Sequence, residues 1–219
     1  MSKKRGMLSL ADTAAELNKI YKKAPQTVLN RTLSDVRTRV PGWVGAEVAA
    51  QYGIKKKEVG DGKTSTLKIK GQKLPDVSLV YTGRVLTPTH FNMTPSAPKP
   101  GGGYTLKASI IKGRRTTLGK VKKLTKKQRA ALGKNFRREG TRSSDHSPIM
   151  LMHTGNTKEG GTNYIPFQRK SARRKDVKVV KTLSVPQMID SEKVNPNIQK
   201  AIDEKLGKRL EHHLKLLEK

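Results

Sequence analysis

The segment from Lys107 to Arg142 carries more positive charge than a compact fold holds without a partner. It contains 14 Lys or Arg among 36 residues, and Glu139 is its only acid, so its net charge is +13. Like charges crowded into one lobe repel one another and oppose compaction. The counter-charge must come from nucleic-acid phosphate, from an acidic face of a neighbouring subunit, or from a membrane surface.

A second basic segment, Arg169 to Lys178, has six basic residues against one acid, a net charge of +5. Most such runs are solvated loops. Where they contact phosphate, no base sequence is read. Stacking on bases requires aromatic side chains, and Phe136 is the only one in the first segment. The residues that we predict to contact DNA or an acidic partner are Lys112, Arg114, Arg115, Lys120, Lys122, Lys123, Lys126, Lys127, Arg137, Arg138, Arg173 and Arg174.

Composition limits the size of the core. The 219 residues have a net charge of +30, and only 33% are hydrophobic and 4% aromatic. Such a chain is expected to rely on partners or on its own copies for part of its stability. Without cysteine it has no disulfide and no thiolate chemistry. Asp12 and Glu16 interrupt the only candidate for a signal peptide, and no apolar run is long enough to span a membrane. We therefore expect a soluble protein that is not secreted.

Helical signals dominate residues 1–60. Ser9 is a suitable N-cap for a first helix, and Pro25 suits the first turn of a second one. Pro41-Gly42 is expected to end that helix, and Trp43–Tyr52 to form a short third helix. These signals predict a helical hairpin or triplet.

Residues 61–183 change to strand signals, in which apolar and polar residues alternate. Such alternation indicates that one face of the sheet is exposed to solvent, so we expect a central antiparallel or mixed sheet. The basic loop 107–142 falls within this β-rich region. The predicted strands are Leu67–Lys70, Val77–Leu79, Thr105–Ile110, Ile149–His153, Tyr164–Phe167 and Val177–Leu183.

Residues 184–219 return to helix. Asn195 is a good N-cap, and Pro196 suits the first helical position. Residues 181–219 hold eight basic and six acidic residues, so this helix is nearly neutral. Its apolar stripe packs either on its own domain, which is the commoner case, or on a partner. The predicted packing or interface residues are Val194, Ile198, Ile202, Leu206, Leu210 and Leu214.

Together these signals predict an α+β fold that forms one structural domain. It has N-terminal helices, a central antiparallel or mixed sheet with long basic loops, and a C-terminal amphipathic helix packed on that sheet.

No arrangement of residues typical of catalysis is present. Ser144-Asp145-His146 is contiguous, whereas the members of a catalytic triad meet through the fold. Gly101-Gly102-Gly103 lacks the Gly-Lys-Ser/Thr that completes a phosphate loop. We predict no catalytic, metal-binding or cofactor-binding residue, and a surface position for His212 and His213. The five histidines, none in a His-Glu-x-x-His zinc pattern, are His90, His146, His153, His212 and His213.

The chain resembles the phage minor tail protein Z (tail completion) family through short motifs in a shared order. The most specific is Ser184-Val185-Pro186-Gln187-Met188 ahead of the terminal helix, and the basic stretch between Lys120 and Arg142 is long for the family pattern. The motifs are Leu29–Thr32, Gly53–Lys55, Gly71–Pro75, Leu86–Phe91, Lys112–Arg115, Met152–Gly155, Thr182–Ile189 and Lys208–His212.

The resemblance implies a virion component without enzymatic activity, which completes the head-proximal end of a long tail and joins it at the neck. It implies a ring, expected to be a hexamer, in contact with the tail tube or terminator and with head–tail connector proteins. The basic loops would suit either a lumen through which genomic DNA passes or contact with an acidic adjoining ring, and no membrane would be involved. The protein would be found in the virion, and in the host cytoplasm during assembly. The alternative, which composition supports equally, is a non-specific nucleic-acid-binding protein of ribosomal or nucleoid type.

Overall fold

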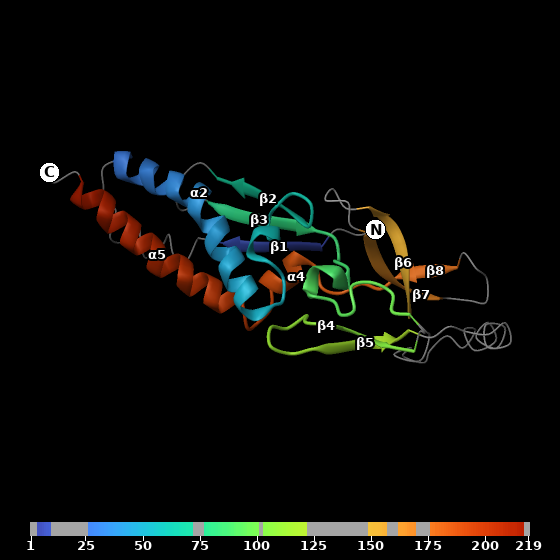
Figure 1. Cartoon of the computed structure of the whole chain (residues 1–219). Coiled ribbons are helices and arrows are strands. Elements are labelled where there is room, and N and C mark those ends of the chain that lie inside the picture. The colour runs from blue at the N-terminus through green and yellow to red at the C-terminus, as the bar shows by residue number, and fades with distance from the viewer. Residues whose placement is uncertain are drawn as a thin grey trace. The chain divides into compact units, whose positions relative to one another are not determined.

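A computed structural model describes residues 4–9, 26–71, 77–100, 103–121, 149–156, 162–169 and 176–216. Over these ranges the chain combines helices with three antiparallel sheets, which confirms the predicted α+β class (Figure 1). It divides into two compact units. Unit 1 comprises Met1–Leu86 with Leu183–Lys219, and unit 2 comprises Thr87–Thr182. That the whole chain forms one structural domain stays a prediction.

The long helix of unit 1 is α2 (Gln26–Gln51), which runs through Pro41 without ending. The predicted break at Pro41-Gly42 and the separate third helix are therefore wrong. A proline inside a helix costs about 3 kcal/mol. Val36, Val40, Val44 and Val48, all fully buried, form one continuous stripe across it. Burying each valine contributes about 1.5 kcal/mol or more, so the stripe outweighs the proline.

The sheet of unit 1 has the order β1-β3-β2, with both pairings antiparallel. Its strands are β1 (Lys4–Ser9), β2 (Ser65–Lys70) and β3 (Ser78–Gly83). Strand β1 was not predicted, and the helix predicted to follow Ser9 lies outside the described residues. In β2, Thr66, Lys68 and Lys70 are exposed while the residues between them are at least half-buried, as alternation predicts.

Helix α4 (Val185–Ile189) packs against β1 and β3. Ser184 begins it with a capping box: its hydroxyl accepts a bond from the Gln187 backbone N–H, and its own backbone N–H donates to Gln187 Oε1 at 3.1 Å. Because Val185, Met188 and Ile189 are fully buried, this short helix closes the core beneath the sheet.

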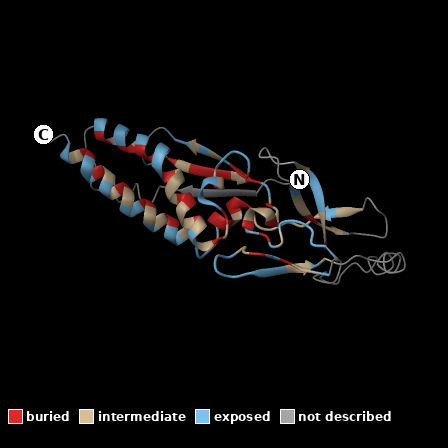
Figure 2. Cartoon of the chain, viewed as in Figure 1, coloured by how far each residue is buried: buried red, intermediate tan, exposed pale blue. Residues whose placement is uncertain are grey.

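Helix α5 (Asn195–Lys215) packs mainly along α2, not on the sheet as the sequence suggested (Figures 1 and 2). Its buried residues Ile198, Ile202, Leu206 and Leu210 face the valine stripe of α2. Val194, not Asn195, occupies the N-cap position, without a side-chain cap bond. The apolar stripe is therefore packing surface within this chain.

Unit 2 contains two small antiparallel sheets instead of a continuation of one central sheet. They share a core of Met93, Leu106 and Ile149, against which four half-buried side chains pack. Strand β8 ends at Val179, earlier than predicted, and β5 was not predicted because it lies inside the basic segment. The strands are β4 (Thr105–Ala108) with β5 (Thr116–Lys120), and β6 (Ile149–Asn156), β7 (Thr162–Arg169) and β8 (Val177–Val179) in that order.

Replacing Leu210 by Asp should destabilise the protein by about 3 kcal/mol or more, because it places an unpaired charge in the fully buried stripe. The matched control is Leu216→Asp, since Leu216 is 48% exposed. That control should change the free energy of unfolding by no more than about 0.5 kcal/mol. Urea unfolding measures both. Equal effects of the two substitutions would contradict burial of the stripe.

Candidate polyanion interface

The clearest candidate interface is the basic hairpin, residues 103–121, formed by β4, β5 and the turn between them. Lys107, Lys112, Arg114, Arg115 and Lys120 give it five cations and no acid. All five side chains are exposed, and within the described residues none of them has an ion-pair partner. The turn brings three cations into the four residues from Lys112 to Arg115.

The hairpin is anchored by its other face. Leu106 and Ala108 are fully buried, while the intervening Lys107 is exposed, as expected for a strand with one wet face. The ladder pairs Thr105 with Lys120 and Leu106 with Gly119, and a register shift follows Leu106. Lys107 and Lys120 therefore stand on the paired strands, and the ladder carries the turn that holds the other three cations.

Backbone hydrogen bonds also tie the hairpin to the rest of unit 2. Thr94 and Lys107 exchange bonds of 2.8 and 2.9 Å, and the Ser109 N–H donates to the Phe91 carbonyl at 2.8 Å. At the open end, the Val121 N–H donates to the Tyr104 carbonyl at 2.8 Å. An anion that meets the hairpin thus meets charges whose backbone positions are already set, which lowers the entropic cost of binding.

Such a surface suits contact with phosphate groups or carboxylates, and it lacks what base readout requires. Between Thr105 and Val121 there is no aromatic side chain for stacking. Of the predicted contact residues, Lys112, Arg114 and Arg115 lie together in the turn of the hairpin, and Lys120 lies at its open end, paired with Thr105. The other eight, Lys122, Lys123, Lys126, Lys127, Arg137, Arg138, Arg173 and Arg174, lie outside the described residues.

The predicted stripe on α5 contains a feature that sequence reasoning missed. Among the buried apolar residues of α2 and α5 lies the Asp35 carboxylate, which is only 9% exposed. Its Oδ1 accepts a bond from Arg39 Nε at 2.7 Å, and its Oδ2 accepts from Arg209 Nε at 2.7 Å. His213 Nε2 lies 2.9 Å from the same Oδ2. We call these four residues the Asp35 cluster; it joins α2 to α5.

His213 was predicted to lie on the surface, and that prediction is wrong: its side chain is buried, whereas His212 is exposed. The reason lies in helical geometry. Residues four apart drift by about 40° around a helix that has 3.6 residues per turn. The stripe therefore returns to the buried side with a step of three, from Leu210 to His213, and Leu214 is only half-buried.

Electrostatics keep Asp35 ionised. Burial alone raises the pKa of Asp35, but the bonds from Arg209, His213 and Arg39 together outweigh it and hold that pKa well below the ordinary value of 3.8. His213 Nδ1 is buried and has no hydrogen-bond partner among the described residues. The sequence did contain a signal for this cluster, since Asp35 falls within the buried run Val28, Thr32, Val36 and Val40 of α2.

Metal-ligand groups and membrane-spanning helices are both absent from the described residues. Among them, no three His, Asp or Glu side chains gather as a metal site requires. No helix in the same ranges is long and apolar enough to cross a bilayer. Ser144, Asp145 and His146 lie outside the described residues.

No protein-family model matches the chain, and neither a curated protein nor a solved structure matches it.

Asp35→Asn should lower the free energy of unfolding by about 3 kcal/mol at about pH 5.5, because it leaves Arg209 and His213 without their anion. The folded-state pKa of Asp35 lies below its unfolded value, so its stabilisation is complete above about pH 4 and fades as pH falls further. The difference from the wild type should therefore shrink at about pH 3. Urea unfolding at both pH values measures it.

Glu211→Gln serves as the control, since it removes an exposed carboxylate from α5, the helix that carries Arg209 and His213. It should have little effect at either pH. A stability loss for Asp35→Asn that does not change with pH would show that the charge of Asp35 is not what joins the helices.

Proposed function

We propose that this protein is a non-enzymatic structural component of a phage virion that completes the head-proximal end of the tail. The order of its sequence motifs, which resembles that of the tail-completion family, supports this class. The observation that carries the proposal is the basic hairpin, with five exposed cations: Lys107 and Lys120 on its paired strands and three in the turn between them. Such a surface suits a passing phosphate backbone or an acidic neighbouring ring, and requires no sequence recognition.

Assembly into a ring is the second part of the proposal. Few hydrophobic residues are available, and among the described residues of unit 2 Met93, Leu106 and Ile149 form a small cluster. Contacts with neighbouring copies would add buried area, and identical head-to-tail contacts close into a ring where the rotation permits. We propose a hexamer that contacts the tail tube or terminator and the head–tail connector. Localisation in the virion is part of the same proposal.

We expect mass photometry to detect the ring, alone or once tail-tube ends are added. Closed assemblies of one size, and binding at tail ends, are the expected results. Because α5 packs within its own chain, Leu216→Asp should leave assembly intact. A strict monomer that ignores tail ends would remove the tail-completion proposal and favour the alternative.

That alternative is a free, non-specific nucleic-acid-binding protein, and the same hairpin favours it. The two proposals differ in how far the function of the protein depends on binding nucleic acid. On the alternative, binding to nucleic acid is the activity itself. On the tail-completion proposal, the free protein binds it only weakly, and its main readout is the infectivity of assembled particles.

Duplex DNA binding by the free protein should be insensitive to sequence and should weaken with salt, by about 0.9 log units per log unit of salt for each phosphate neutralised. Replacing Lys112, Arg114 and Arg115 with Gln should reduce that slope by about two to three. The fold should survive, since all three side chains are exposed. Fluorescence anisotropy across a salt series measures the slope.

The matched control replaces three exposed lysines of unit 1, Lys193, Lys208 and Lys215, with Gln, which removes the same charge elsewhere. It should leave most of the slope unchanged. In particles, the hairpin variant should impair infectivity while tails look normal. A tight, sequence-selective complex that survives high salt would contradict tail completion, because phosphate contacts alone do not select sequence.

A further inference from the structure

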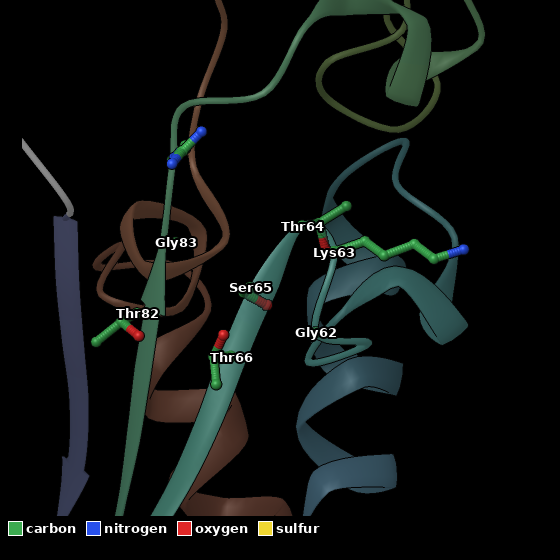
Figure 3. A pocket seen from close by; sticks show the side chains of 8 residues that line it. Gly62, Lys63, Thr64, Ser65, Thr66, Thr82 and Gly83 are labelled. Atoms are coloured by element: carbon green, nitrogen blue, oxygen red, sulfur yellow. The ribbon is translucent and has the colours of Figure 1, made fainter. Parts of the chain in front are cut away.

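A hollow lies at the end of the β2–β3 ladder in unit 1, and we call it the β2–β3 notch (Figure 3). Its cavity volume is about 230 Å³, and residues 62–66 and 82–84 line it. Those eight residues comprise two glycines, four hydroxyl side chains, one lysine and one arginine. No acid and no large apolar side chain lines the notch, so its chemistry suits a small anion.

One wall of the notch is a loop fixed by its own hydrogen bonds. Asp61 Oδ1 accepts bonds from the backbone N–H groups of Lys63 and Thr64, each at 2.8 Å. Ser65 Oγ accepts from the Gly60 N–H at 2.9 Å. Gly60 and Gly62 supply the positive φ angles, 82° and 80°, that this path requires.

The Asp61 carboxylate is engaged by that loop and does not line the notch. Burial raises the pKa of Asp61, but the hydrogen bonds from Thr64 and Lys63 lower that pKa by more than burial raises it. The carboxyl group therefore stays ionised. It is the nearest acid in the sequence, and its charge is satisfied locally. An anion in the notch would therefore not be repelled by the Asp61 carboxylate as part of the lining.

Two of the four hydroxyl groups make no bond to the loop. The hydroxyl of Thr64 donates to the Glu58 carbonyl, and that of Ser65 accepts from Gly60, so both serve the loop. Thr66 and Thr82 stand directly opposite each other in the antiparallel ladder. Residues paired in this way present their side chains on the same face of a sheet. Figure 3 shows these two threonines on neighbouring strands at the notch.

One cation accompanies these hydroxyls in the lining of the notch. Arg84 follows Thr82 by two residues, lines the notch, is exposed, and has no ion-pair partner in the described part of the chain. Lys63 lines the rim, with its side chain extending away from the strands in Figure 3.

We propose that the β2–β3 notch binds one phosphate group, either free or carried by a nucleotide or a nucleic-acid strand. Its volume of about 230 Å³ is below that of sites for whole drug-sized ligands, roughly 300 Å³ and above. Hydroxyl donors and a guanidinium fork are the groups that phosphate oxygens accept from. Gly62-Lys63-Thr64 does not make this a phosphate loop of the nucleotide-hydrolysing kind, because Lys57 replaces that motif's first glycine and a strand follows.

The test is a titration of the full chain with inorganic phosphate, followed by ¹⁵N NMR, with sodium chloride at matched ionic strength as the blank. The backbone amide signals of Gly62, Thr66 and Gly83 should shift and saturate. Arg84→Gln should weaken the affinity about tenfold, as expected for the loss of a charged hydrogen-bond donor. The double change Thr66→Val and Thr82→Val, which keeps the branched side-chain shape, should also weaken it.

Arg114→Gln in the basic hairpin is the control, and it should leave phosphate binding at the notch unchanged. A second titration, with a short single-stranded oligothymidylate, identifies the source of the phosphate. Saturation of the same signals at lower concentration points to a strand, and saturation by inorganic phosphate alone points to a free anion. No saturable shift, or an affinity that Arg84→Gln leaves unaltered, overturns the proposal. Neither result depends on the tail role, since no tail is present.

Discussion

The packing of α2 along α5 is the interaction on which unit 1 depends, because it joins residues 26–51 to the far end of the chain. The apolar stripes alone hold the two helices close together but do not fix how far one is shifted along the other, because hydrophobic contact has no preferred direction. The Asp35 cluster adds what they lack. A shift of one helix along the other would separate the Asp35 carboxylate from Arg209 and His213, and a buried charge without partners costs several kcal/mol. The hydrophobic effect thus supplies the stability of this interface, and the ion cluster fixes its register.

A chain with this much positive charge can fold because its cations and its core lie on opposite faces of short strands. Lys107 stands exposed between Leu106 and Ala108, which are fully buried, and β2 exposes Thr66, Lys68 and Lys70 in the same way. Water screens the charges while the backbone carrying them is held by its ladder. The described part of the chain therefore presents basic surface on both units without burying an unpaired cation.

The basic hairpin and the β2–β3 notch offer two different ways of meeting phosphate. The cations of the hairpin are exposed, so it suits several groups along a strand, each of which adds to the salt dependence. The notch is concave and carries hydroxyl donors, so it suits a single group whose binding depends on geometry as well as charge. The two features belong to separate compact units, which makes their effects separable by substitution.

The sequence by itself determined the fold class, most strand positions and the stripe of α5. Apolar residues that alternate in a strand, or recur every four residues in a helix, indicate which face of the element is buried and which is exposed to solvent. The sequence also predicted the strand at which the basic segment begins, since Leu106 and Ala108 alternate with Lys107. Only the tertiary structure decided that α2 continues through Pro41, because the stability comes from a stripe buried against a distant helix. The same holds for the bond between His213 and Asp35, 178 residues apart, and for the notch, which exists only where two paired strands and their loop meet. Local propensity cannot report contacts between segments that the chain brings together only on folding.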